Sequence, residues 1–287
     1  MPNIAQHHSS QTTKMLLIGN HSSGKTGSLC SLASAGYNLR ILDLDNGVDI
    51  IKSMLLSPKS PYSPDSASRV HYVTLTDPYK KTGVGNAVRL IPQAKTWGRI
   101  TDMIGHWKTE DEDLGRVQDW TEKDVLVIDS LSMLSKAAMS AVLAMNARLG
   151  QRPQLQDFGA GQDMVESVLE LLYDENIRCN VVVIAHLTFI EDKSGITHAY
   201  PRAIGKALPP KIGQYFNSVV MVQSSGQGAS IKQQLHTRTT GVIELKNSNP
   251  LKVQPTYPLE TGLADFFRDV RGDLPVEPQV KLAGEAK

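Results

Sequence analysis

Short apolar runs recur along the chain, and most of them are followed by a stretch with helical periodicity. The runs that predict buried strands lie at residues 15–18, 39–44, 70–75, 125–128 and 181–185. Apolar residues three or four positions apart predict helices after residue 25 and over residues 94–108, 131–145 and 161–173. Strands that are apolar on both faces and alternate with helices are typical of a parallel sheet covered on both sides. The pattern therefore predicts an α/β fold with a mostly parallel central sheet and helices on both faces.

The pattern changes in the last third of the chain, where shorter apolar stretches follow one another without helices between them. Those at residues 219–222, 233–238 and 242–245 predict added strands, which we expect to be antiparallel. Between the two parts we expect a long linker over residues 188–210. Residues 77–92, which contain two glycines, are expected to form an irregular connection.

Polar and Pro-rich segments mark the expected limits of the domain. Residues 1–13 predict a flexible leader, and the Pro/Ser-rich stretch at 57–68 predicts an exposed insertion. From residue 269 onward Pro, Gly and charged residues dominate, which predicts a disordered tail over 269–287. We therefore expect a single domain over residues 14–268.

The turn between the first predicted strand and helix carries the strongest chemical motif, G-N-H-S-S-G-K-T. Its glycines would let the loop wrap closely with its N–H groups inward, beside the positive end of the helix dipole. Lys25 would reach the β- and γ-phosphates of a nucleotide, and the Thr26 hydroxyl would hold Mg²⁺. A flexible turn without a ligand is the alternative, but it does not explain why the motif joins a strand to a helix. The residues expected to contact a nucleotide are Gly19, Asn20, His21, Ser22, Ser23, Gly24, Lys25, Thr26 and Gly27.

Other candidates directly follow apolar runs, because ligands of parallel sheets bind at the carboxyl ends of strands. Asp129 follows V-L-V-I and would bind Mg²⁺ beside Thr26, or else cap the next helix. In L-D-L-D-N-G, Asp45 and Asp43 are competing candidates for the general base, and a simple Asx turn is the alternative. His186 follows V-V-V-I-A and would sense the γ-phosphate, although a structural histidine also fits there.

Composition limits the possible partners. Lys and Arg total 30 and Asp and Glu total 29, so the net charge of +1 gives no overall attraction to nucleic acid or membranes. Contact with nucleic acid would therefore need local basic loops. No apolar run approaches the roughly 20 residues of a membrane span, so we expect a cytoplasmic protein without a membrane partner. Cys30 and Cys179 are expected to be buried and reduced, which suits the same compartment.

The motifs G-N-H-S-S-G-K-T, I-L-D-L-D-N-G, V-L-V-I-D-S and V-V-V-I-A-H, in this order, resemble the RecA/RadA-like P-loop ATPase core. The first and third correspond to the Walker A and Walker B motifs. The resemblance covers roughly residues 14–248 and is closest to short phage-encoded nucleotide-binding proteins, including single-strand annealing ATPases. It implies ATP and Mg²⁺ as ligands, ATP hydrolysis, assembly into a ring or filament, and the host cytoplasm if the protein is phage-encoded. It also assigns the catalytic carboxylate to Asp45, where relatives have Glu, and a phosphate sensor to His186.

The resemblance further implies where DNA and a neighbouring subunit would bind. The two loops that bind single-stranded DNA in recombinases correspond to residues 146–158 and 188–210. Their basic residues are Arg148, Arg152, Lys193, Arg202 and Lys206. Related ATPases present a cation from a late strand to the neighbour's nucleotide, and Lys246 occupies that position in V-I-E-L-K-N-S-N. Arg238 is the second candidate, and an edge-strand lysine without a catalytic role is the alternative for Lys246.

These features favour an ATPase that oligomerises and binds single-stranded DNA for annealing or recombination. A nucleotide-dependent switch or loader that acts on a protein partner is the second hypothesis, and the short Asp45 side chain suits its slow hydrolysis. A ring translocase is the third, although no sequence feature is dedicated to strand displacement.

Overall fold

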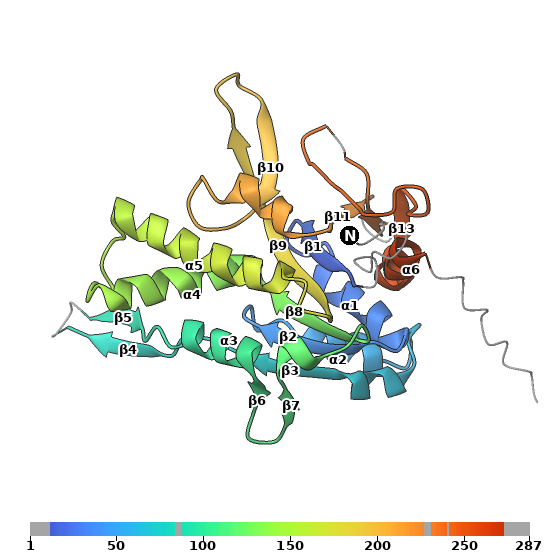
Figure 1. Ribbon diagram of the computed structural model, residues 1–287, viewed down its shortest axis with the longest axis horizontal. Helices are drawn as coiled ribbons and strands as arrows, with labels where there is room; N and C mark the ends of the chain where they lie inside the picture. The colour runs from blue at the N-terminus through green and yellow to red at the C-terminus, as the bar shows by residue number, and fades with distance from the viewer. Residues whose placement is uncertain (1–11, 84–87, 227–230, 240, 273–287) are drawn as a thin grey trace, which may run out of the picture.

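A mostly parallel sheet forms the centre of the molecule (Figure 1). The computed structural model describes residues 12–83, 88–226, 231–239 and 241–272. Within them the sheet has the order β13-β12-β11-β1-β9-β8-β2-β3. The six strands from β11 to β3 are parallel, and β12 and β13 add to β11 as antiparallel neighbours. Their bounds are β1 Lys14–Gly19, β2 Asn38–Asp43, β3 Val70–Thr74, β8 Asp124–Asp129, β9 Asn180–Glu191, β11 Ser218–Ser225, β12 Lys232–His236 and β13 Thr256–Pro258.

Helices cover both faces of this sheet because successive strand residues point to opposite sides. On β1, Leu16 and Ile18 face the core shared with α3, α4 and α5, whereas Met15 and Leu17 face α1 and α6. The helices are α1 Lys25–Ser34, α2 Asp49–Leu56, α3 Thr96–Gly105, α4 Leu131–Met145, α5 Leu155–Tyr173 and α6 Leu259–Arg271. Short 3₁₀ segments lie at η3 Pro64–Arg69, η4 Val117–Asp119 and η5 Pro209–Tyr215. The predicted α/β fold class, with a mostly parallel central sheet, helices on both faces and antiparallel strands toward the C-terminus, is confirmed.

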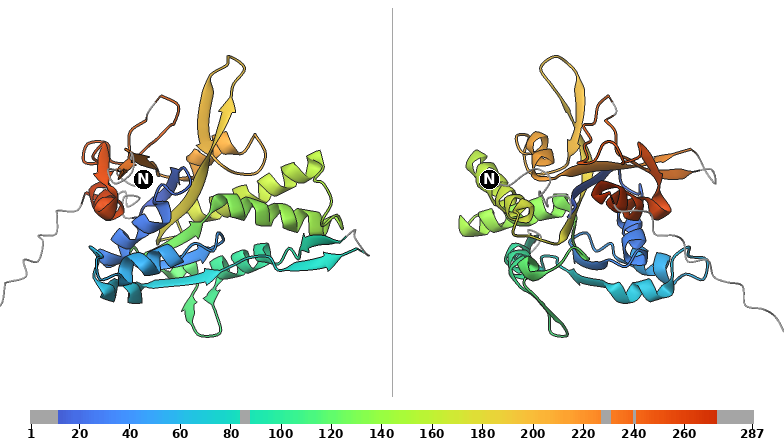
Figure 2. Two further views of the ribbon diagram at one scale, coloured as in Figure 1. Left: turned by 180° about the vertical axis from the view of Figure 1, so that it is seen from behind. Right: turned by 45° about the vertical axis from the view of Figure 1, so that its right-hand side comes forward.

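The predicted linker over residues 188–210 is wrong for much of its length. Strand β9 continues through Glu191 and pairs with β10, Thr197–Pro201, in an antiparallel hairpin. The hairpin projects from the body of the molecule (Figures 1 and 2). Polar residues that alternate with apolar ones in a projecting hairpin bury little surface, so the hydrophobic pattern did not reveal the strands.

Three helix boundaries differ from prediction. The helix expected over 94–108 ends at Gly105, and Trp107 instead begins a two-residue strand, β6 Trp107–Lys108, that pairs with β7, Asp113–Gly115. Helix α5 begins at Leu155, before the predicted residue 161, and the Asp157 carboxylate accepts the backbone N–H of Gln154 at its start. The tail expected from residue 269 is helical through Arg271 because α6 packs its apolar face on α1.

Several other segments also differ. The irregular connection at 77–92 contains a hairpin of β4, Tyr79–Thr82, and β5, Arg89–Pro92. The described residues 242–245 do not form the expected strand, and an isolated antiparallel bridge joins Lys246 to Val219. The insertion at 57–68 is mainly surface, but Tyr62 is buried and its hydroxyl donates to the Glu260 carbonyl at 2.8 Å. Most of the predicted leader and tail lies outside the described residues.

No helix in the described ranges is both long and apolar enough to cross a membrane.

Candidate nucleotide site

The loop between β1 and α1 forms a cradle that only glycine permits at two points. Gly24 has φ 98°, and a Cβ there would lie 2.5 Å from Leu259 and 3.0 Å from Gln233. A Cβ on Gly19 would lie 2.6 Å from the Val222 carbonyl oxygen. The loop is therefore held between β11, β12 and α6, and its shape depends on close approach of backbone to backbone.

Lys25 curls back into this cradle. Its ammonium donates to the carbonyls of Gly19 at 3.0 Å and Asn20 at 2.6 Å, and lies 3.5 Å from His186 Nδ1. Burial lowers the pKa of Lys25, and the nearby carboxylates oppose that shift. The Ser23 hydroxyl is buried and has no hydrogen-bond partner among the described residues. A partly desolvated cation and an unsatisfied hydroxyl in a loop of this shape fit a phosphate ligand.

Thr26 and Asp129 form a pair suited to a metal. The Thr26 hydroxyl donates to Asp129 Oδ2 at 2.6 Å, and Asp129 is 4% exposed. Burial, together with the charges of Asp45 and Asp43, raises the pKa of Asp129 to about 6, although the hydrogen bond from Thr26 opposes this shift. The described residues contain no cluster of three or more His, Cys, Asp or Glu that could hold a metal by itself. A hydroxyl and one buried carboxylate fit Mg²⁺, which usually takes its remaining ligands from phosphates and water.

Asp43 is occupied by structural hydrogen bonds. It is fully buried, accepts the Gly47 N–H at 2.9 Å, and accepts the Thr74 hydroxyl at 3.0 Å. These bonds fix the turn after β2 and join it to β3. Both carboxylate oxygens are therefore engaged away from an incoming water.

Asp45 is placed differently, with its carboxylate toward the loop. Its Oδ2 lies 3.6 Å from His186 Nε2. Burial tends to raise the pKa of Asp45, but His186 and the Ser130 hydroxyl outweigh burial and lower the pKa. The backbone N–H groups of Leu44 and Asp45 donate to the Asp129 carbonyl at 2.6 and 3.2 Å, so the ends of β2 and β8 are tied together. Of the two carboxylates, Asp45 is the one with room to act on a ligand.

His186 bridges the phosphate loop and the end of β2. It lies opposite Gly19 in the β1–β9 register, with Nδ1 toward Lys25 and Nε2 toward Asp45. The His21 ring stacks on it with centroids 3.9 Å apart and an interplanar angle of 24°. The neighbouring His186, with a smaller contribution from desolvation, lowers the pKa of His21. His186 therefore contacts the cradle, the candidate base and the strand that continues into the projecting hairpin.

Sequence reasoning missed three contacts of the loop. His21 was expected only as a loop residue, not as the stacking partner of His186. Gln233 on β12 approaches the Ser22 carbonyl at 3.5 Å, and Leu259 at the start of α6 packs beside Gly24. No local signal marks Gln233 or Leu259, because chain folding more than 200 residues after the loop brings them there.

The predicted DNA-binding residues are not equivalent in the structure. Arg148 forms an ion pair with the fully buried Asp157, which also accepts the Asn146 amide at 3.0 Å. Its guanidinium is thus part of the α4–α5 connection and is not presented to a ligand. The remaining four are exposed: Arg152, Lys193, Arg202 and Lys206.

Arg202 lies nearest to the nucleotide site. Its backbone N–H donates to the His186 carbonyl at 2.7 Å, and its charge contributes to lowering the pKa of His21. Lys193 lies instead in the turn of the β9–β10 hairpin, between Asp192 and Ser194.

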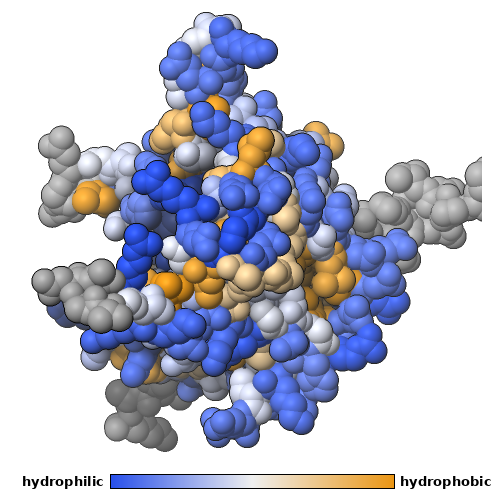
Figure 3. Space-filling model, turned by 90° about the vertical axis from the view of Figure 1, so that its left-hand side faces the viewer, coloured by the Kyte–Doolittle hydropathy of each residue, from blue (hydrophilic) through white to orange (hydrophobic). Residues whose placement is uncertain are grey.

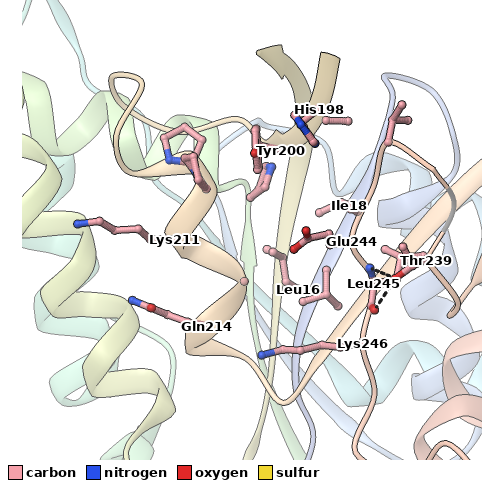
Figure 4. A pocket seen from close by; sticks show the side chains of 17 residues that line it. Leu16, Ile18, His198, Tyr200, Lys211, Gln214, Thr239, Glu244, Leu245 and Lys246 are labelled. Atoms are coloured by element: carbon pink, nitrogen blue, oxygen red, sulfur yellow. Dashed lines mark hydrogen bonds between the residues drawn. The ribbon is translucent and has the colours of Figure 1, made fainter. Parts of the chain in front are cut away.

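Lys246 is remote from the phosphate loop of its own chain. It bridges Val219, which pairs with Leu16, three positions before Gly19. Its side chain lines a separate cavity of about 630 Å³ between β10, η5 and residues 239–246 (Figure 4). Arg238 donates to the Pro250 carbonyl at 3.1 Å. Neither cation reaches the cradle within one chain.

Comparisons with known proteins agree with the motif analysis. A family described as an AAA domain matches residues 11–248. No curated protein matches the chain. A solved KaiC-like protein from the archaeon Pyrococcus horikoshii is 12% identical, with a TM-score of 0.43 and coverage of 87% of this chain and 88% of that chain. The RadB recombinase is 12% identical with a TM-score of 0.44, covering 87% and 89%. FlaH, a flagellar accessory protein from Methanocaldococcus jannaschii, is 13% identical with a TM-score of 0.39, covering 85% and 83%.

Proposed function

Since the chain belongs to the AAA-domain family, we propose that it binds ATP with Mg²⁺ in the loop of residues 19–27 and hydrolyses it. One observation carries this proposal: Lys25, the Thr26–Asp129 pair and Asp45 come from three separate motifs and meet at one edge of the sheet. A phosphate-binding cation, a metal-binding pair and a carboxylate for the attacking water are the parts that hydrolysis of a phosphoanhydride needs.

Each side chain has a distinct role in the proposed reaction. Lys25 exchanges its two bonds to loop carbonyls for bonds to the β- and γ-phosphate oxygens. Mg²⁺ bound by Thr26 and Asp129 would neutralise negative charge on the phosphates. Asp45 accepts a proton from the attacking water, and its lowered pKa keeps it ionised at neutral pH. The same low pKa makes Asp45 a weak base, so we expect slow turnover without a partner.

His186 is proposed to report the state of the phosphates to the rest of the molecule. In the structure its Nδ1 faces the Lys25 ammonium, which cannot accept a hydrogen bond, so the neutral ring would carry its proton on Nε2 toward Asp45. When Lys25 turns to the phosphates, Nδ1 of His186 loses the Lys25 ammonium as its hydrogen-bond donor. Because Leu187 and the residues after it form the projecting hairpin, a change at His186 reaches the hairpin directly.

We further propose that the protein assembles and binds single-stranded DNA, as an annealing or recombination protein would. The exposed Arg152, Arg202 and Lys206 support DNA binding. Lys246 fits assembly, since it lies away from the phosphate loop of its own chain and a nucleotide in contact with it would belong to a neighbouring subunit. Such a cation supplied in trans is worth about 10³ to 10⁵ in turnover.

A nucleotide-dependent switch that acts on a protein is the second candidate, and one observation favours it. The projecting hairpin exposes Phe189 by 59% and Ile196 by 56%, and its Glu191 and Asp192 outnumber Lys193. Exposed apolar side chains without excess positive charge suit a protein partner better than a phosphate backbone.

ATP turnover measured with and without single-stranded DNA, across a range of protein concentrations, tests both candidates. An annealing ATPase should hydrolyse faster with DNA, and its specific activity should rise with concentration as subunits assemble. Turnover indifferent to DNA would favour the protein switch. Turnover that persists unchanged in Lys25→Ala would contradict the whole assignment.

A further inference from the structure

A basic and apolar surface lies at the end of the molecule where the β4–β5 hairpin meets the α4–α5 connection (Figure 1). We call it the hairpin–turn surface; it comprises β4, β5, residues 145–155 and Lys136. The two segments are in contact, since a Cβ on Gly150 would lie 2.6 Å from Ile91 Cδ1. Residues 77–92 and 145–155 are far apart in sequence, so only the fold creates this surface.

Positive charge outnumbers negative charge on this surface. Five cations are exposed, and none of them takes part in an ion pair with any described residue: Lys80, Lys81, Arg89, Lys136 and Arg152. The carboxylates nearby are engaged. Asp77 accepts the backbone N–H groups of Lys95 and Thr96 at 2.7 and 2.8 Å, and Asp157 pairs with Arg148. A chain with a net charge of only +1 therefore concentrates positive charge at this end.

Large apolar side chains are exposed between these cations. Tyr79 is 54% exposed, Leu90 64%, Met145 70% and Leu155 91%. In the hairpin register Lys81 pairs with Leu90, and Tyr79 lies two positions along the same face, so an aromatic ring, an aliphatic side chain and a cation share it. Lys80 and Arg89 lie on the other face of the hairpin, together with Ile91. Hydrophobic and strongly hydrophilic side chains are interleaved on this end of the molecule (Figure 3).

We propose that the hairpin–turn surface binds single-stranded nucleic acid. Unpaired cations attract the phosphate backbone, whereas the exposed Tyr79 ring and Leu90 offer a platform for unstacked bases. An acidic protein segment would satisfy the cations but would not need an exposed aromatic ring beside Lys81. This proposal deepens the proposed function and rests on it, and it moves the main nucleic-acid contact from Arg202 and Lys206 to β4–β5.

The surface is also joined to the nucleotide site. A hollow of about 170 Å³ is lined by Leu44, Tyr79 and Lys136, among other residues. Leu44 directly precedes Asp45, and its backbone N–H donates to the Asp129 carbonyl. Strand β3, which leads into the hairpin, is tied to Asp43 through Thr74. Tyr79 and Lys136 therefore connect the hairpin–turn surface, through the hollow, to the segment that carries the candidate base, and nucleic acid bound there should change ATP turnover.

The test is binding of a fluorescein-labelled oligo-dT strand, measured by anisotropy over a range of salt concentrations. The triple variant Lys80→Glu, Lys81→Glu, Arg89→Glu should bind at least about tenfold more weakly. The slope of log affinity against log salt should become shallower by about 2, since each lost phosphate contact removes roughly 0.7. In addition Tyr79→Ala should weaken binding without changing that slope, and Tyr79→Phe should restore it. A melting curve shows that each variant is folded.

A matched control carries the same change in charge elsewhere. Lys52, Lys59 and Lys123 are exposed, lie outside the hairpin–turn surface and form no ion pair with the described residues. The variant with all three replaced by Glu should bind the strand with nearly the affinity of the wild type. Its slope of log affinity against log salt should also be nearly unchanged.

Three results would overturn the proposal. In the first, the triple variant at Lys80, Lys81 and Arg89 binds the strand as tightly as the wild type. That result would place the DNA elsewhere and leave the proposed function intact. Wild-type protein that hydrolyses ATP but does not bind the strand would remove both this site and the DNA role, and would keep the ATPase. Tighter binding to poly-glutamate or to phosphatidylserine vesicles than to the strand, lost in the same variant, would assign the surface to an acidic protein or a membrane.

Discussion

Replacing Asp129 by Asn should make the nucleotide-free protein more stable while removing its use of Mg²⁺. The carboxylate is 4% exposed, and its pKa is raised from 3.8 to about 6, chiefly by burial. A difference of this size means that the ionised form costs about 3 kcal/mol in the folded state. An amide carries no charge and still accepts the Thr26 hydroxyl, although its NH₂ group needs a partner of its own. We therefore expect a gain of about 1–3 kcal/mol, or a melting temperature raised by roughly 2–6 °C.

The dependence of this stability difference on pH provides a second, independent test of the prediction. The folded pKa lies above the unfolded value, so the native state holds the proton between about pH 3.8 and pH 6. Below this window both states are protonated and Asp129 contributes no penalty. As pH rises through the window the penalty develops, and above it the penalty is complete. The difference between Asp129→Asn and the wild type should therefore be near zero at about pH 4 and largest above pH 6.

Thermal denaturation followed by circular dichroism, with EDTA present, measures this difference across the pH range. Addition of Mg²⁺ and ATP should then stabilise the wild type and leave Asp129→Asn nearly unchanged, because a ligand that binds the native state stabilises it in proportion to its affinity. A variant that is less stable than the wild type at neutral pH, or a difference that does not vary with pH, would refute the reasoning that burial strains this carboxylate.

Three further substitutions test the site and its surroundings. Lys25→Ala should abolish nucleotide binding in a filter or fluorescence assay while the melting temperature without nucleotide stays close to that of the wild type; retained binding would remove the lysine from the cradle. Asp45→Asn should keep ATP binding but lower turnover by about 10² to 10⁴-fold, whereas Asp43→Asn should mainly lower stability, and the reverse outcome would identify Asp43 as the base. Arg148→Ala should destabilise the fold by roughly 2–4 kcal/mol, since it leaves the buried Asp157 unpaired, and a variant as stable as the wild type in urea titration would show that the pair is unimportant.

Local patterns in the sequence were sufficient for the central part of the fold. Apolar runs predicted the buried parallel strands because both faces of these strands are excluded from water. Almost every position in such a strand must therefore be apolar. Helix α4 was predicted at its observed bounds, because its apolar stripe begins directly after a strand and ends at a polar loop. The phosphate loop and the acidic residues at the strand ends could be located because their spacing and neighbours form short, local motifs.

The same approach failed where structure depends on contacts with little buried surface. The β4–β5 and β9–β10 hairpins project from the body, so their exposed side chains do not follow a burial pattern. Arg148 looked like a free cation because its partner, Asp157, lies nine residues away across a turn. Distant folding likewise decided that Gln233 and Leu259 would lie against the loop.

The candidate nucleotide site could thus be located from the order of its residues, since a phosphate-binding motif must place a few side chains within one turn of backbone. How those side chains are partnered was settled by packing. Asp43 and Asp45 are two positions apart and chemically identical, yet the first is bonded to Thr74 and Gly47 while the second faces His186. That distinction, like the meeting of β4–β5 with the α4–α5 connection, arises from strands and loops that meet only after the chain has folded.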